Sequence, residues 1–149
     1  IAYADNDNLN LKYAIHDGSQ WHLQTIDTLD HVTPSPFASN SVCSISLSFD
    51  PEGNPAIVYC IPSQPGWQQK CAFYDGETWQ TQIIDSYKES GGAIFFGGPG
   101  NSISHASNGQ PAIAYVRPDP EVENQDQNEL AFATYDPSRF TTEHLDESE

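Results

Sequence analysis

One stretch of the chain recurs twice more along it. LKYAIHDGSQWHLQTID (11–27) matches KCAFYDGETWQTQIID (70–85), and both match LAFATYDPSRFTTEHLD (130–146). An internal repeat constrains the fold strongly, because one local structure must recur and its copies must pack on one another. The sequence therefore predicts three copies of one structural unit.

The positions shared by the three copies describe a hairpin. An aspartate is followed in each copy by an aromatic residue, and these pairs are Asp17 and Trp21, Asp75 and Trp79, and Asp136 and Phe140. In the first two copies Gly follows the aspartate directly, and Asp-Gly between alternating runs is a strong hairpin signal. We interpret the aspartates as turn residues. Trp21 and Trp79 are interpreted as core residues, with a ligand-stacking surface as the alternative.

A second repeated block precedes each hairpin. PAIVYC (55–60) matches PAIAYV (111–116), and IAYA (1–4) matches both without the proline. Together with LSFDPEGNP (47–55) and ISHASNGQP (103–111), these blocks make each unit four short strands, the first unit lacking its first strand. The predicted fold is all-β, a single repeat domain over 1–149 with units at 1–27, 42–85 and 101–146.

The strand pattern also indicates how the units stack. In the second strand of the middle unit Ile57 and Tyr59 lie on one side, and Ala56, Val58 and Cys60 lie on the other. A sheet with one wet face would alternate apolar and polar residues. Two apolar faces favour sheets packed on both sides, as β-propeller blades are.

Three blades do not close a propeller, whose rings hold about four to eight. The chain also starts at Ile1 and contains no methionine. We therefore expect a fragment or a processed chain. Either a second copy of itself or the rest of a longer chain would complete the propeller.

The chain is strongly acidic, with 21 Asp and Glu against 5 Lys and Arg and a formal net charge of −16. Such a surface repels nucleic-acid phosphates and anionic membranes. No apolar run reaches the roughly 18 residues of a membrane helix. We expect neither a nucleic-acid nor a membrane partner.

The repeat resembles those of sialidase-like and related bacterial β-propellers. The residues that carry this resemblance are G-N-P-x-I-x-Y and L-K-Y-A-x-x-D-G-x-x-W-x-x-x-x-I-D. The resemblance implies the blade fold, but propellers host lectins, scaffolds and hydrolases alike. A sialidase-like hydrolase would need three arginines to clamp its substrate, and this chain has only Arg117 and Arg139. We expect a protein that is not an enzyme.

A binding surface is expected at one end of the blades. The turns between first and second strands, and between third and fourth, are repeated and share one end. The connections at the other end differ from unit to unit, and variable loops on a rigid scaffold commonly carry binding. At that end Trp67, Phe95, Phe96 and Arg117 are the candidate ligand-binding residues.

Two further predictions concern a metal site and the cysteines. No cofactor is expected, and Asp5 and Asp7 are the residues that a calcium ion would use. Cys60 and Cys71 end one strand and begin the next, so they are either buried thiols or a cross-strand disulfide. The sequence does not fix the compartment, although a disulfide would favour a secreted or extracytoplasmic bacterial protein.

The leading functional hypothesis is a non-enzymatic module that binds a carbohydrate or a protein through the variable-loop end. The first alternative is a structural or assembly platform within a larger propeller. The second is a fragment of a sialidase-like glycoside hydrolase.

Overall fold

The computed structural model describes residues 1–5, 7–28, 42–63, 66–88, 100–118, 128–136 and 138–145. This part of the chain consists of β-strands and turns with no helix, so the all-β prediction is confirmed. It accordingly holds no helix long and apolar enough to cross a membrane.

The strands form three antiparallel sheets in chain order. Sheet 1 consists of β1 (Ala2–Asp5), β2 (Asn10–His16) and β3 (Trp21–Thr28). Sheet 2 consists of β4 (Cys43–Phe49), β5 (Pro55–Ser63), β6 (Gly66–Tyr74) and β7 (Trp79–Lys88). Sheet 3 consists of β8 (Asn101–His105), β9 (Pro111–Pro118), β10 (Asn128–Asp136) and β11 (Arg139–His144).

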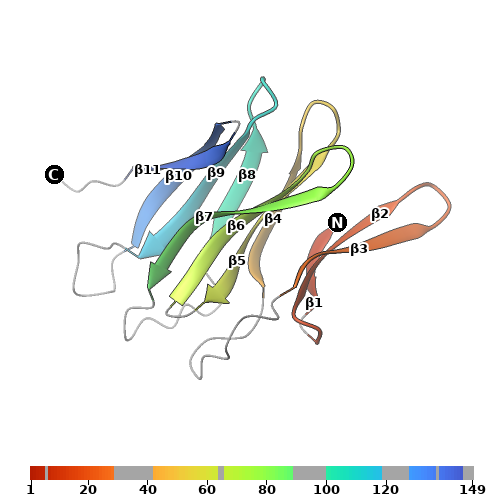
Figure 1. Ribbon diagram of the computed structural model, residues 1–149, viewed down its shortest axis with the longest axis horizontal. Helices are drawn as coiled ribbons and strands as arrows, with labels where there is room; N and C mark the ends of the chain where they lie inside the picture. The colour runs from red at the N-terminus through yellow and green to blue at the C-terminus, as the bar shows by residue number, and fades with distance from the viewer. Residues whose placement is uncertain are drawn as a thin grey trace.

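Sheet 2 lies between the other two sheets (Figure 1). One of its faces packs on sheet 1 through the large side chains of Ile57, Tyr59 and Ile61, all buried. The small side chains of Ala56 and Val58, on the other face, pack on Ile113 and Tyr115 of sheet 3. The two apolar faces seen in the sequence are therefore two buried interfaces. We call them the seam between sheets 1 and 2 and the seam between sheets 2 and 3.

The repeated turns have repeated geometry. Asp17 and Asp75 each accept two backbone N–H bonds from residues just after them, at 2.8–2.9 Å. Gly18 and Gly76 follow them with φ of 100° and 99°, a backbone conformation that glycine adopts without strain. The turns after β4 and β8 match each other too, since Gly53 donates to Asp50 O and Gly109 to Ala106 O. All these turns lie at one end of the sheets, at the top of Figure 1.

Two local predictions are wrong. The variable connection between the second and third strands of the middle unit, where Trp67 was expected, is mostly strand, because β5 runs to Ser63 and β6 starts at Gly66. Trp67, in β6, is only 5% exposed and packs with Cys60 and Tyr87. Burial of these side chains lets the strand pair continue past the polar Gln68 and Gln69.

The second correction concerns Trp21, which is 53% exposed rather than part of the core. Its repeat partner Trp79 packs at 5.4 Å on Tyr13 of sheet 1 and donates a 2.9 Å hydrogen bond to Gln24. Among the described residues no sheet lies in front of sheet 1 to receive Trp21. Its ring instead contacts His16 of its own sheet at 5.1 Å.

The cross-strand disulfide between Cys60 and Cys71 is not formed. Cys71 is a free, fully buried thiol, and Val58 lies opposite it across the strand pair. Cys60 lies opposite Gln69, two pairs further along. The two cysteines are thus diagonal rather than facing neighbours.

Candidate functional site

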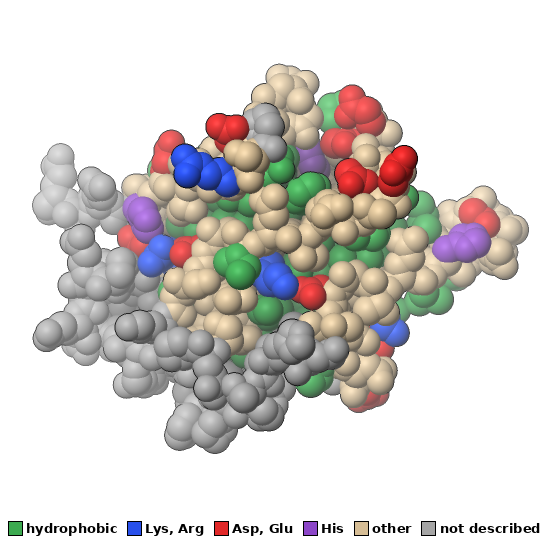
Figure 2. All heavy atoms as spheres, viewed as in Figure 1, with side chains coloured by type: hydrophobic (Ala, Val, Ile, Leu, Met, Phe, Trp, Pro, Cys, Tyr) green, Lys and Arg blue, Asp and Glu red, His purple; other side chains and the backbone are tan. Residues whose placement is uncertain are grey.

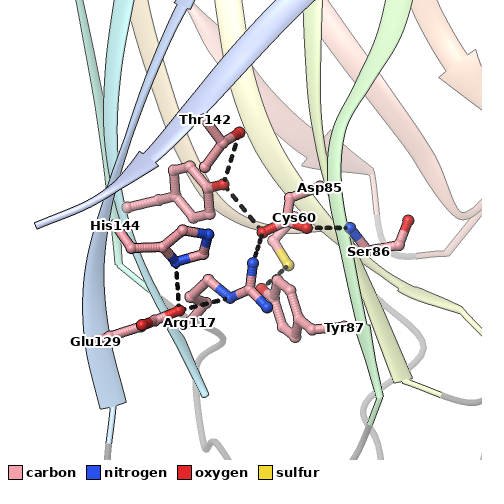
Figure 3. A network of polar contacts seen from close by, with 9 residues as sticks. Cys60, Asp85, Ser86, Tyr87, Arg117, Glu129, Thr142 and His144 are labelled. Atoms are coloured by element: carbon pink, nitrogen blue, oxygen red, sulfur yellow. Dashed lines mark hydrogen bonds and ion pairs between the residues drawn. The ribbon is translucent and has the colours of Figure 1, made fainter. Parts of the chain in front are cut away.

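The predicted site residue Arg117 lies in the seam between sheets 2 and 3, at the end of β9. Its Nη1 lies 2.7 Å from the Asp85 carboxylate of β7, and its Nε lies 3.1 Å from Glu129 of β10. Figure 3 shows the guanidinium between these two carboxylates, with the His144 ring bound to Glu129 at 2.7 Å. With only 12% of its side chain exposed, Arg117 is committed to contacts within the protein.

The same arrangement recurs one seam earlier. Asp27 of β3 accepts a 2.6 Å hydrogen bond from the Tyr59 hydroxyl and pairs with the Lys70 ammonium of sheet 2. Asp85 likewise accepts a 3.0 Å bond from the Tyr115 hydroxyl of sheet 3. Each seam therefore contains an aspartate from one sheet that binds a tyrosine and a cation of the next.

The tyrosines in these seams are permanent hydrogen-bond donors. Burial, and then the neighbouring aspartate, raise the pKa of Tyr59 far above its usual range. Burial raises the pKa of Tyr115 in the same direction. Both hydroxyls stay protonated at any physiological pH, so these contacts hold adjacent sheets together.

The remaining predicted site residues are not brought together. Trp67 is buried with Cys60 and Tyr87 of its own sheet. The Cys60 Sγ lies 3.5 Å from the Tyr87 hydroxyl. Phe95 and Phe96 lie outside the described residues. Of the four predicted ligand-binding side chains, Trp67 and Arg117 are thus held by contacts within the protein.

Of the two predicted calcium residues, Asp5 already has bonding partners within the protein. The Asp5 carboxylate pairs with Lys12 at 2.8 Å and accepts bonds of 3.0 and 3.1 Å from the Asn8 amide. Asp7 is exposed. No group of three or more His, Cys, Asp or Glu side chains suited to a metal ion occurs in the described part of the chain.

A hollow of about 320 Å³ opens at the other end of the seam between sheets 2 and 3. We call it the turn cavity, because the turns after β4 and β8 form its rim. Figure 2 shows apolar side chains between the turns that project at the top of the molecule. The lining residues are Asp50, Asn54, Pro55, Ala56, Phe73, Tyr74, His105, Asn108, Gly109, Gln110, Pro111 and Tyr135.

The apolar part of the turn cavity is made of aromatic rings. Phe73 of β6 and Tyr135 of β10 lie 5.5 Å apart across the seam, tilted by 54°. Tyr74 follows Phe73 in β6, so its ring lies on the opposite face of sheet 2, where it contacts Trp79 at 5.6 Å. Within the turn cavity, Phe140 supports the Tyr135 ring at 5.0 Å. Rings supported in this way present fixed apolar surfaces to a ligand.

The polar part of the turn cavity comes from the two turns. The Asp50 carboxylate accepts bonds of 2.7 and 2.9 Å from Asn54, and the Asn108 amide donates to Gln110 at 2.9 Å. Burial would raise the pKa of Asp50, but the bonds from Asn54 outweigh it and lower that pKa. Asp50 is therefore a charged carboxylate whose bonding capacity is partly filled.

Several lining groups keep unfilled bonding capacity. His105 Nδ1 contacts Ser48 Oγ at 3.0 Å, and burial lowers the pKa of His105, so its ring is neutral at pH 7. Its Nε2, the Gln110 Nε2 and the Tyr135 hydroxyl have no hydrogen-bond partner among the described residues. The turn cavity thus combines aromatic surfaces with neutral donors and acceptors.

These residues were not predicted from the sequence, because repeated turns are typical of a scaffold. One signal was present: Tyr74 and Tyr135 precede the turn aspartates at equivalent repeat positions. That pattern places an aromatic residue at the turn end of adjacent sheets. It does not show that the sheets leave a hollow between them.

No protein-family model matches the sequence, and no curated protein matches it. Among solved structures, the chain is similar to a fucose lectin from Kordia zhangzhouensis, determined in complex with methyl-fucoside. The sequences are 15% identical, the match covers 96% of this chain and 87% of that one, and the TM-score is 0.49. A likeness of this size does not transfer the lectin's ligand to this chain.

Proposed function

We propose that this chain is a non-enzymatic recognition module that binds a neutral saccharide in the turn cavity. The observation that carries the proposal is the combination of two aromatic rings, Phe73 and Tyr135, with unfilled neutral hydrogen-bonding groups in one hollow of about 320 Å³. A volume of this size is at the lower end of the range for small-molecule pockets, about 300–1,000 Å³.

The chemistry of the lining favours a sugar over other small ligands. A sugar ring has an apolar C–H face that can stack on Tyr135 or Phe73, and its hydroxyls both donate and accept hydrogen bonds. The Gln110 amide donates, and the neutral His105 ring donates or accepts according to its tautomer. Such groups recognise hydroxyls without demanding a charge.

Charge argues for a neutral ligand in particular. The charged side chain in the lining is the carboxylate of Asp50, and the whole chain carries a formal net charge of −16. An acidic sugar would be repelled by both. We therefore expect neutral hexoses or deoxyhexoses to bind more tightly than uronic or sialic acids.

The same lining argues against hydrolysis. Glycosidases commonly use two carboxyl groups on either side of the scissile bond. The lining supplies one carboxylate, Asp50, which is held by Asn54. This favours recognition over the sialidase-like hydrolase alternative.

The variable-loop end remains a separate prediction. Its connections 29–41, 89–99 and 119–127 lie outside the described residues. Of the described residues predicted to bind there, Trp67 is buried against Cys60 and Tyr87, and Arg117 is paired with Asp85. The turn cavity therefore has the stronger support.

The test is titration with simple methyl glycosides, including the methyl-fucoside of the similar lectin, followed by NMR chemical shifts and calorimetry. Tyr135→Ala removes an aromatic surface and Gln110→Ala removes an amide. Each should weaken binding about tenfold, the effect of roughly 1.4 kcal/mol. Neutral glycosides should bind and glucuronides should not.

Trp21→Ala is the matched control, because Trp21 is a more exposed aromatic residue on a different sheet. Binding that survives Tyr135→Ala but is lost in Trp21→Ala would place the site elsewhere. Absence of binding by every glycoside, or acceleration of glycoside hydrolysis by the chain, would refute the proposal. The first result would favour the assembly-platform alternative.

A further inference from the structure

Each packed seam joins two different sheet faces. We call the face that receives the next sheet the trailing face, and the face that packs on the previous sheet the leading face. The trailing faces of sheets 1 and 2 end in Ile26–Asp27 and Ile84–Asp85, and both isoleucines pack against the core clusters. The leading faces of sheets 2 and 3 supply the tyrosine and the cation that bind those aspartates.

Sheet 1 has a leading face with the same groups. Leu11 and Tyr13 of β2 pack toward sheet 2, so Lys12 between them points the opposite way. Ala2 and Ala4 of β1 also pack toward sheet 2, which places Tyr3 on the same opposite face. In the repeat Tyr3 and Lys12 hold the positions of Tyr59 and Lys70.

Exposed apolar side chains accompany these groups. Trp21 holds the repeat position of the packed Trp79 but is 53% exposed, and Leu23 beside it is 63% exposed. Trp21 pairs with His16 and Leu23 with Ala14, so both lie on the leading face with Lys12. Lys12 is 26% exposed and is held on this face by Asp5.

Sheet 3 has the complementary trailing face. Leu145 holds the repeat position of Ile26 and Ile84, yet it is 54% exposed. Leu130 is 42% exposed, whereas Leu11 at the same repeat position is 0% exposed. The residue after Leu145 in the sequence is Asp146, the repeat partner of Asp27 and Asp85, which lies outside the described residues.

We propose that the leading face of sheet 1 docks on the trailing face of sheet 3 of a second copy of this chain. The contact is the one already made in both internal seams. Trp21 and Leu23 of the leading face and Leu130 and Leu145 of the trailing face become buried. The occupant is a second copy because the chain itself carries both halves of the contact, on sheets that sheet 2 separates.

The assembly forms a closed ring when each of two copies uses both its leading face and its trailing face. A head-to-tail contact forms a ring if its rotation closes. Two copies bring six sheets together, twice the three sheets of one chain, within the range of about four to eight blades in propellers. The net charge of −16 on each copy opposes this assembly, so it should strengthen as salt is added.

The test is the mass of the purified chain in solution, by light scattering and native mass spectrometry, over a wide range of protein concentration. Trp21→Glu places a charge in the leading face, and Leu145→Glu places one in the trailing face. Both side chains are more than half exposed, so each variant should fold as the parent does, checked by circular dichroism. Ile83→Glu is the matched control, because Ile83 is also 53% exposed but belongs to the middle sheet.

We expect the parent chain and Ile83→Glu to form dimers and each face variant alone to be monomeric. Mixing Trp21→Glu with Leu145→Glu should give a one-to-one dimer, because one intact leading face meets one intact trailing face.

A parent chain that stays monomeric over the whole concentration range would overturn the proposal. Dimers that persist in either face variant, or a mixture that does not associate, would overturn it as well. Leu23→Glu, on the same leading face, repeats the test if Trp21→Glu loses its circular dichroism signal.

Discussion

Replacing Asp27 by alanine should destabilise the protein more than replacing Asp85, although the two residues hold the same repeat position. Asp27 accepts from the Tyr59 hydroxyl and pairs with the Lys70 ammonium. Tyr59 is 0% exposed and the Lys70 side chain is 14% exposed. Asp27→Ala therefore leaves a buried hydroxyl and a nearly buried cation without their carboxylate.

The loss in free energy of unfolding depends on the contacts that each cation and each hydroxyl retains. Breaking a fully buried ion pair costs about 3–5 kcal/mol, and a buried unmet hydroxyl about 1–3 kcal/mol. Since the Asp27 and Lys70 side chains keep 17% and 14% exposure, we expect about 3 kcal/mol for Asp27→Ala.

The second seam should lose less. After Asp85→Ala, Arg117 keeps Glu129 at 3.1 Å, and the Tyr115 hydroxyl keeps Thr142 at 3.5 Å. Asp85→Ala removes its contacts with Arg117 and Tyr115, but each of these keeps another partner, so we expect a loss of about 1.5 kcal/mol. The expected difference between the two variants is thus about 1.5 kcal/mol, a tenfold change in the folded-to-unfolded ratio.

Urea unfolding followed by circular dichroism measures both variants. With a slope of about 2 kcal/mol per molar urea, the midpoint should fall by about 1.5 M for Asp27→Ala and about 0.75 M for Asp85→Ala. Tyr59→Phe, which leaves Asp27 with Lys70, should cost about 1 kcal/mol. Equal midpoints for the two aspartate variants at an unchanged slope, or a larger loss at Asp85, would refute the reasoning.

Three further predictions address packing, thiol reactivity and pH. Trp79→Ala should lower the free energy of unfolding in urea by about 2 kcal/mol, because it removes the ring packed on Tyr13. Trp21→Ala in the monomer should change that free energy by less than about 0.5 kcal/mol, because Trp21 is exposed, and similar losses in the two variants would contradict this. Burial raises the pKa of the Cys71 thiol to about 12, so iodoacetamide at pH 8 should label it only as fast as the protein unfolds, and rapid labelling seen by mass spectrometry would contradict its burial. Burial lowers the pKa of His105, so its contribution to stability is complete above its unfolded pKa of about 6.5 and is lost as pH falls through the lower folded value; urea midpoints should show this loss, and His105→Gln should lack it.

Much of the local structure could be predicted from the residues. The repeat placed Gly18 and Gly76 in equivalent tight turns, and the structure gives them nearly the same φ. Alternation along the second strand placed Tyr59 on the large face and Val58 on the small one, and the structure buries both. These features depend on backbone conformation and on the period of two along a strand, which neighbouring residues set.

The candidate site could not be predicted in the same way. Trp67 stands between polar residues and glycine, so its context indicated a loop, yet packing with Tyr87 draws it into a strand. Arg117 was expected near a ligand, yet two carboxylates from different strands bind it. Both outcomes depend on side chains distant in sequence, and a single sequence does not show which of those meet.

The sequence by itself determined the three-fold repeat, the strands, the turns and the two apolar faces of the middle sheet, because these follow from local propensity and alternation. Only the tertiary structure decided where the repeated residues differ in role. The same position is packed in Trp79 and exposed in Trp21, since burial depends on whether a neighbouring sheet is there to cover it. The turn cavity is likewise a property of two adjacent sheets, because its lining combines the turns after β4 and β8 with the rings of Phe73 and Tyr135.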